Sequence, residues 1–193
     1  MKYLPLLLLT LFIAIGACNS SPEVIDDLTD RSFELVDQDS VEVTFPDDYK
    51  GKYVVMSFIY TNCPDICPLI TQNLIKIQKD LDNPDVQFLA VTFDPKRDTP
   101  ETLSKYKSVF HLDENFNFLT GEEETINAFM DSVRVRTQVS LSTTTQDGTE
   151  LYFLNHSDKI MVMNPEGKVI IEYGGSQPSV PKLIVQDLNR LLK

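Results

Sequence analysis

The chain has 193 residues, of which 42% are hydrophobic, and this fits one domain with a sizeable core. Acidic residues outnumber basic residues by 29 to 17, so the formal net charge is −12. This balance argues against binding to nucleic acid and against binding to anionic membrane surfaces.

The start of the chain has the features of a secretory signal peptide. One positive charge precedes an apolar run over residues 4–14, which is short for a membrane-spanning helix. Ile15–Cys18 resembles a bacterial lipobox, in which Cys18 becomes the lipid-bearing N-terminus. We therefore expect a signal peptide over residues 1–17 and a lipidated N-terminus and tether over residues 18–31. The domain would then be a membrane-anchored lipoprotein outside the cytoplasm, on the periplasmic side; the alternative is an uncleaved membrane anchor.

The first half of the domain predicts a hairpin and then a strand–helix–strand unit. Residues 33–36 and 41–43 flank a polar turn, which is typical of a β-hairpin. Residues 53–59 are almost continuously apolar and predict a central buried strand. Apolar residues then recur at helical spacing over 70–81, and a second buried strand follows over 86–91. This order predicts a right-handed crossover and a parallel strand pair.

Two more helices and a strand follow. Thr99 is a good N-cap for a helix that reaches Phe110. Residues 115–119 alternate as in a short strand. Residues 120–123 have the form of a capping box and predict a helix that reaches Met130.

The last part of the chain completes an α/β pattern. The polar residues 140–148 predict a surface loop or the tip of a hairpin. A second hairpin is expected over residues 160–171, and the final helix begins near Ser179. This order of elements is typical of a thioredoxin-like fold with a central mixed sheet, flanking helices and an N-terminal β-hairpin extension, over residues 32–193. In such a fold, chemistry gathers at the carboxyl ends of the parallel strands.

The cysteines provide the main functional signal. Cys63 and Cys67 lie where the central strand ends and the next helix begins. Free N–H groups and the positive end of the helix dipole favour thiolates at such a junction. If Cys18 carries lipid, these two form a pair in a compartment that tends to oxidise thiols. From the residues alone, redox chemistry, metal binding and a structural disulfide all remain open.

The chain has two histidines, and they differ in context. His111 follows a predicted helix and is expected to be a surface residue. His156 follows an aromatic and apolar run, so it is either a satisfied core or loop residue or a ligand.

Several motifs together resemble the Sco/SenC family of copper-binding, thioredoxin-like proteins involved in cytochrome c oxidase assembly. They occur in family order and span roughly residues 33–193. The matching segments are Thr61–Pro68, Asp94–Thr99, Leu119–Gly121, Asn155–Ser157 and Asn164–Gly167.

The resemblance implies that Cys63, Cys67 and His156 bind copper. Two thiolates and an imidazole form a soft donor set that suits Cu(I), and a further weak ligand would also allow Cu(II). Two positions depart from the common family pattern: Asn62 replaces a frequent histidine, and Asn155 replaces a frequent acid. Both changes affect residues next to ligands and therefore the hydrogen bonding around the site.

The resemblance also implies a function in copper delivery. The protein would carry copper to the copper A site of cytochrome c oxidase subunit II, and it would need a copper donor and a thiol reductant. The alternative is an enzyme, a thiol–disulfide oxidoreductase that reduces the cysteines of that site, with Cys63 in the mixed disulfide and Cys67 resolving it. The three-residue spacer between the cysteines and the distant histidine favour the carrier.

Other polar residues near the motifs have open roles. Asp65 and Asp94 could orient the metal site through hydrogen bonds, and capping or turn roles are equally consistent with the sequence. A thiol peroxidase would need an arginine beside Cys63, and the sequence does not place Arg97, Arg134 or Arg136 there.

Overall fold

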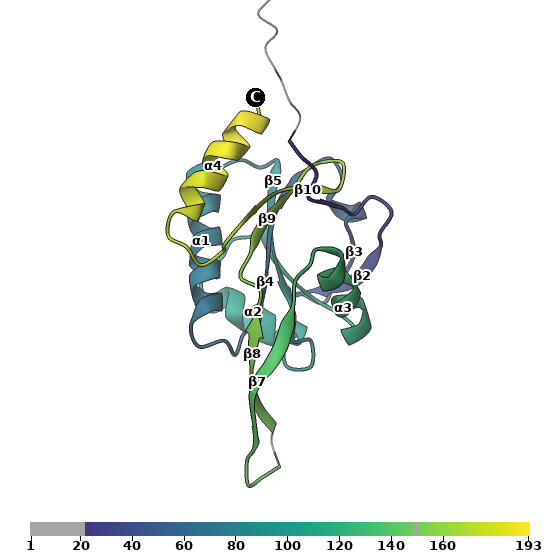
Figure 1. Cartoon of the computed structure of the whole chain (residues 1–193), viewed down its shortest axis with the longest axis vertical. Helices are drawn as coiled ribbons and strands as arrows, with labels where there is room; N and C mark the ends of the chain where they lie inside the picture. Colours follow the sequence, from purple (N-terminus) through teal and green to yellow (C-terminus); the bar gives the residue numbers. More distant parts are fainter. Residues whose placement is uncertain (1–21, 149) are drawn as a thin grey trace, which may run out of the picture.

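A computed structural model describes residues 22–148 and 150–193 (Figure 1). Ten strands and four helices are found in these ranges, together with a short 3-10 turn at Asp47–Tyr49. The strands are β1 Asp26–Asp27, β2 Phe33–Asp37, β3 Glu42–Phe45, β4 Tyr53–Ile59, β5 Val86–Thr92, β6 Phe116–Thr120, β7 Thr137–Thr144, β8 Glu150–His156, β9 Ile160–Met163 and β10 Lys168–Tyr173. The helices are α1 Ile66–Leu81, α2 Pro100–Val109, α3 Glu123–Ser132 and α4 Val180–Leu191.

Eight of the strands form one mixed sheet in the order β1-β10-β9-β4-β5-β6-β2-β3. Strands β4, β5 and β6 are parallel, whereas β9 pairs antiparallel with β4 on its other side. Strand β4 is therefore central and covered on both faces, and this explains its unbroken apolar sequence. The predicted thioredoxin-like fold with an added β2–β3 hairpin is confirmed.

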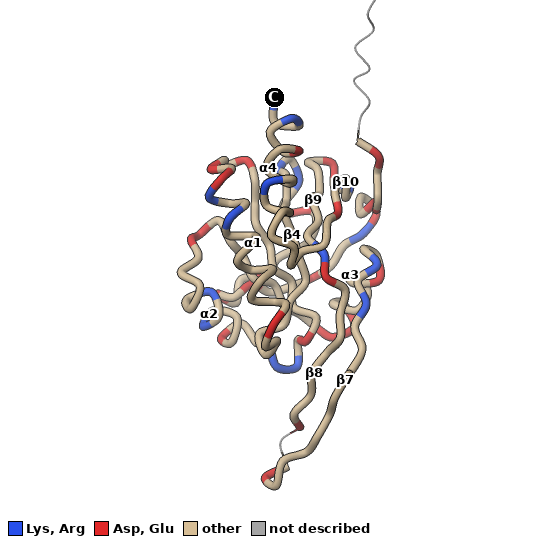
Figure 2. Tube along the Cα trace, turned by 60° about the vertical axis from the view of Figure 1, so that its left-hand side comes forward, with Lys and Arg blue, Asp and Glu red and all other residues tan. Residues whose placement is uncertain are grey.

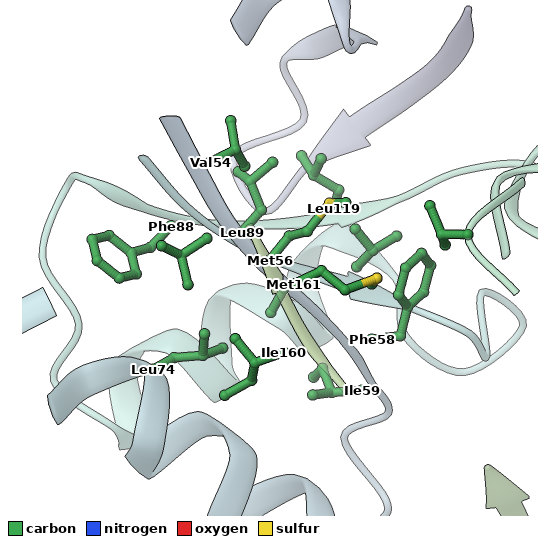
Figure 3. Packing of buried hydrophobic residues seen from close by; sticks show 14 of the residues in the cluster. Val54, Met56, Phe58, Ile59, Leu74, Phe88, Leu89, Leu119, Ile160 and Met161 are labelled. Atoms are coloured by element: carbon green, nitrogen blue, oxygen red, sulfur yellow. The ribbon is translucent and has the colours of Figure 1, made fainter. Parts of the chain in front are cut away.

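The helices cover the sheet in two layers. Helices α1 and α4 lie side by side, and the amide of Asn73 on α1 donates to the carbonyls of Gly175 and Gln177 before α4 (Figure 1). Helix α3 packs against strands β2, β3 and β4, where its Phe129 contacts the rings of Phe33, Phe45 and Phe58. Figure 3 shows the resulting core: Leu74 of α1 lies beside Ile160, and Met56, Met161 and Phe58 extend away from them.

Strands β7 and β8 form a separate two-stranded sheet, the β7–β8 hairpin. It projects well beyond the rest of the domain in Figures 1 and 2. Figure 2 also shows its two arms to be almost free of charged residues, whereas acidic residues are spread over the main body. The predicted hairpin tip is confirmed, but β7 extends to Thr144, so much of the polar 140–148 segment is strand. Cross-strand hydrogen bonds can form there without an apolar face.

The described part of the expected tether, residues 22–31, contains ordered contacts with the domain: β1 pairs with β10, and Leu28 is fully buried.

One local expectation needs correction. The capping box at 120–123 is wrong, because Thr120 ends β6 and the N-cap of α3 is Glu122, whose side chain makes no cap hydrogen bond.

The expected signal peptide and lipobox, including Cys18, lie outside the described residues. Among the helices of residues 22–148 and 150–193, none combines the length and the apolar character needed to cross a membrane.

Candidate metal centre

The two cysteines lie at the junction between β4 and α1, as the sequence predicts. Cys63 is in the loop after β4, and Cys67 is in the first turn of α1. Both are free thiols, and they are 7% and 0% exposed, respectively. The backbone N–H of Cys67 donates to Cys63 Sγ at 3.4 Å, and that of Tyr60 donates to Cys67 Sγ at 3.4 Å. One backbone donor at the end of β4 and one in the first turn of α1 therefore contact the two sulfurs.

His156 ends β8 and reaches the cysteines from the base of the β7–β8 hairpin. Its Nε2 atom lies 3.6 Å from Cys67 Sγ. Its Nδ1 atom is 2.9 Å from the carbonyl oxygen of Ser157, which can only accept. Nδ1 therefore carries a proton, and Nε2 is the ring nitrogen that faces the sulfurs.

An aromatic wall surrounds the imidazole. The ring of Phe93 lies 4.7 Å from the ring of His156 between centroids, and Tyr60 meets it edge-on at 6.0 Å. Phe93 and Tyr60 are 5% and 1% exposed, so this side of the imidazole is shielded from water. The shielding strengthens electrostatic interactions at the sulfurs.

The two thiols differ in their pKa values. A hydrogen bond from Cys67 lowers the pKa of Cys63 far below its ordinary value; burial opposes this shift, and His156 and the backbone N–H of Cys67 reinforce it. The same hydrogen bond to Cys63, and burial, raise the pKa of Cys67. Burial lowers the pKa of His156, but interactions with Cys63 and Ser157 outweigh it, so the net shift is upward. The pKa values of the two thiols therefore shift in opposite directions, which favours a thiolate on Cys63 over one on Cys67 in the metal-free pair.

The two aspartates singled out from the sequence have different surroundings. Asp65 is the N-cap of α1 and accepts from the N–H of Ile66 at 2.6 Å, and the same oxygen lies 3.5 Å from Cys63 Sγ. Asp94 contacts none of the three donor residues: its carboxylate pairs with Arg97 and accepts from the hydroxyl of Tyr152. Asp65 therefore caps α1 and also lies close to the sulfur of Cys63, whereas Asp94 contacts the β7–β8 hairpin through the hydroxyl of Tyr152.

The sequence analysis missed a buried carboxylate that fixes the cysteine loop. Asp98 is fully buried and accepts from the backbone N–H and hydroxyl of Thr61 and from the hydroxyl of Thr92. Burial raises its pKa, and the hydrogen bonds from Thr61 and Thr92 oppose this shift. Asp98 belongs to the family-like segment Asp94–Thr99, which the sequence already singled out, but only the fold brings that segment next to Thr61.

The site opens to the surface at the histidine. A shallow depression next to His156 is lined by Asp65, Ile66, Leu154, Asn155 and Asp158. Asn62 and Asn155, the two departures from the family pattern, are both exposed. A separate hollow lies elsewhere, beside the exposed His111, and contains none of the donor residues.

The three donor atoms form a set that can hold a metal ion. The two Sγ atoms and a ring nitrogen of His156 all lie within 4.8 Å of one another. Two thiolates and one imidazole suit soft metals such as Cu(I), whereas a structural zinc site normally has four protein ligands. The fold and the site therefore define a thioredoxin-like domain with a Cys₂His centre.

Comparison with known proteins agrees with this class. The SCO1/SenC family model matches residues 23–193, and the chain belongs to this family. A SCO2-like protein of Rickettsia felis is 34% identical over 158 residues, covering 81% of this chain and 73% of the relative. The mitochondrial SCO2 homologue of Homo sapiens is 33% identical over 134 residues, which is 67% of this chain and 48% of that protein.

Solved structures give the same result. A SCO1/SenC family lipoprotein from Bacillus anthracis has a TM-score of 0.72 and 31% identity, covering 90% of this chain and 99% of that chain. Arabidopsis thaliana ScoI with copper bound has a TM-score of 0.66 and 29% identity, covering 82% and 97%. BsSco, a member of the Sco family of cytochrome c oxidase assembly proteins with an identified disulfide switch, has a TM-score of 0.68 and 25% identity, covering 88% and 96%.

Proposed function

We propose that this protein is a copper chaperone, which binds copper through Cys63, Cys67 and His156 and delivers it to the copper A site of cytochrome c oxidase subunit II. One observation carries the proposal: the three donor atoms lie within 4.8 Å of one another on a family member's fold. Sco structures with copper bound, from Arabidopsis thaliana and Bradyrhizobium japonicum, support it.

The donor set favours Cu(I) over harder ions. The lowered pKa of Cys63 favours its thiolate, and Cu(I) binding at Cys67 displaces the proton of that thiol. The Nε2 atom of His156 supplies the third donor, because Nδ1 is engaged with the carbonyl of Ser157 and Nε2 faces the sulfurs. A three-coordinate site leaves room for an incoming fourth ligand, and a weak one would also stabilise Cu(II).

Delivery then proceeds by ligand exchange. A thiolate of the target binds the open position of Cu(I), and a cysteine of the chaperone leaves, so that copper changes partners without a change of oxidation state. The cysteines must stay reduced between cycles, which requires a thiol reductant and a copper donor outside the cytoplasm.

We also propose that the domain is held on the outer side of a membrane by lipid on Cys18, after removal of residues 1–17. The lipobox-like Ile15–Cys18 supports this placement. Cys18→Ser should move the protein from the membrane fraction to the soluble fraction or leave it as an unprocessed precursor. Unchanged membrane attachment with the processed mass would contradict lipidation.

A second candidate function is reduction of the target's disulfide. Two observations favour it: both cysteines are free, and the lowered pKa of Cys63 provides an attacking thiolate. Cys63 would attack the target disulfide and form a mixed disulfide while the leaving target thiolate takes a proton. Cys67 would then attack Cys63, releasing the second target thiol and leaving a Cys63–Cys67 disulfide.

One paired experiment separates the two functions. The copper-loaded chain is mixed anaerobically with the reduced copper-free copper A domain, and transfer is followed by the metal content of the separated proteins. The metal-free reduced chain is mixed with the oxidised domain, and disulfide reduction is followed by thiol counting. We expect copper transfer to fall strongly in His156→Ala while thiol exchange persists. Exchange without any copper transfer would favour the reductase.

A further inference from the structure

The β7–β8 hairpin is half-buried along one face of β8. All residues of β7 after Thr137 are exposed, and along β8 only Tyr152, Leu154 and His156 are half-buried. These alternate positions share one face of the strand. Because Tyr152 lies four residues before His156, it anchors the strand roughly 13 Å from the imidazole. Contacts made by Tyr152 therefore fix one point of the strand that ends in His156.

Arg97 holds Tyr152 by both its ring and its backbone. The Cζ atom of Arg97 lies 3.6 Å from the centroid of the Tyr152 ring, and Nη1 donates to the Tyr152 carbonyl at 2.9 Å. The Nε atom pairs with Asp94, whose other oxygen accepts from the Tyr152 hydroxyl. The ring of Tyr60 lies 5.7 Å from Arg97 Cζ, and its hydroxyl accepts from the N–H of Leu154. A planar guanidinium can make these contacts together, and an ammonium cannot.

The arrangement is not optimised for stability alone. The side chain of Arg97 is 19% exposed, and its Nη2 atom is buried without a hydrogen-bond partner among the described residues. A buried donor without a partner is costly. Its retention beside the hairpin is consistent with a role in geometry.

We propose that Arg97 is a positioning residue for copper binding: by holding Tyr152, it keeps the base of the hairpin in place and the Nε2 atom of His156 close to the cysteine sulfurs. This inference rests on the proposed function, and it adds a residue outside the donor set that sets the site's affinity. Arg97 acts only through His156, so its contribution should vanish when the imidazole is absent.

A double-mutant cycle tests this dependence. Arg97→Lys keeps the positive charge beside the buried Asp94 but loses the planar stack and the fork of donors. Cu(I) affinity is measured against a competing chelator in the reduced full-length chain in detergent, with Cys18→Ser to remove the third thiol. We expect Arg97→Lys to weaken binding about tenfold, and to have little effect in the His156→Ala background. Equal losses in both backgrounds, or no loss in either, would overturn the proposal.

Two further variants guard against a misleading result. Tyr152→Phe removes only the hydroxyl that donates to Asp94 and should give a smaller loss with the same dependence on His156. If Arg97→Lys does not fold, Tyr152→Phe takes its place in the double-mutant cycle, and the loss of Cu(I) affinity is again compared with and without His156→Ala. Arg190→Lys is the matched control, because Arg190 pairs with Asp187 on the distant α4, and it should leave the affinity unchanged.

A copper-free readout separates this inference from the proposed function. In the metal-free reduced chain, ring protons of His156 and Phe93 should show a nuclear Overhauser effect, since their centroids lie 4.7 Å apart. Arg97→Lys should weaken it, and Arg190→Lys should not. A chain that binds no copper but loses this contact in Arg97→Lys would refute the chaperone and keep the positioning role. An unchanged contact would refute the positioning role.

Discussion

The two halves of the candidate metal centre are supported very differently. The cysteines belong to β4 and the start of α1, which are buried inside the main sheet and its helix layer. The histidine ends β8, a strand of a separate hairpin whose outer face is exposed. The sulfurs are therefore fixed by the core, whereas the imidazole is held by a few side-chain contacts at the hairpin base.

This difference suits the proposed copper chaperone, which would bind a metal and release it. Two sulfurs at fixed positions provide a constant platform, and a third donor on a weakly anchored element can leave without disturbing the core. The same difference predicts that mutations in the core will mainly lower the free energy of unfolding. Mutations in the hairpin will mainly lower the affinity for the metal.

The largest expected effect comes from comparing two phenylalanines. Phe129 is fully buried and contacts three aromatic rings, so Phe129→Ala should lower the free energy of unfolding by about 3–5 kcal/mol. Phe153, on the hairpin, is 41% exposed, and Phe153→Ala should cost less than about 1 kcal/mol. Denaturant unfolding measures both. Similar losses would show that the hairpin is part of the cooperative core.

The next effect distinguishes the two thiols within the buried half. At pH 6 and pH 8 Cys63 lies above its lowered pKa, so its thiolate fraction, and its alkylation rate in the metal-free chain, should hardly change. An ordinary thiol would slow by about 100-fold over the same interval. Cys67, with its raised pKa, should stay protonated and react little at either pH. Peptide mapping after alkylation measures both.

A variant of the partner thiol controls this experiment. Cys67→Ala removes the main cause of the lowered pKa and leaves the smaller contributions of His156 and the backbone N–H of residue 67, so the alkylation rate at Cys63 should become more dependent on pH. A rate at Cys63 that falls tenfold per pH unit in the unsubstituted chain would contradict the lowered pKa of Cys63.

The smallest effect concerns the cap of α1. Asp65→Ala removes the acceptor for the N–H of Ile66 and should lower the free energy of unfolding by about 1 kcal/mol. Asp65→Asn is the matched control, because asparagine caps helices about as well, and it should cost less. Equal losses in both variants would assign the effect to the charge of Asp65 and its proximity to Cys63.

Much of the fold follows from local patterns in the sequence. Strand β4 and helix α1 have strong, unbroken signals, and Thr99 caps α2 as expected, with its hydroxyl accepting from the N–H of Thr102. Turn residues likewise predicted the β9–β10 hairpin. These elements depend on neighbours along the chain, and neighbours are visible in a sequence.

The remaining features depend on contacts between distant segments. The approach of His156 to Cys67 joins residues 89 positions apart, and only the family resemblance suggested it. Asp94 was predicted to orient the metal site through hydrogen bonds or to serve as a cap or turn residue, and its carboxylate contacts both the nearby Arg97 and the hydroxyl of Tyr152, which is 58 residues away. The burial of Leu28 is likewise set by β1 pairing with β10. The periodicity of a short segment cannot predict contacts between residues that are this far apart in the chain.

The most direct test of the proposed metal centre is an anaerobic Cu(I) titration of the reduced full-length chain, carrying Cys18→Ser, against a competing chelator. The same titration is run on His156→Ala, and thiol exchange is measured on both as a check of folding. We predict one tight equivalent of Cu(I), weakened at least about tenfold in His156→Ala, with thiol exchange preserved. Equal affinity in the two proteins would contradict a copper site completed by the hairpin histidine.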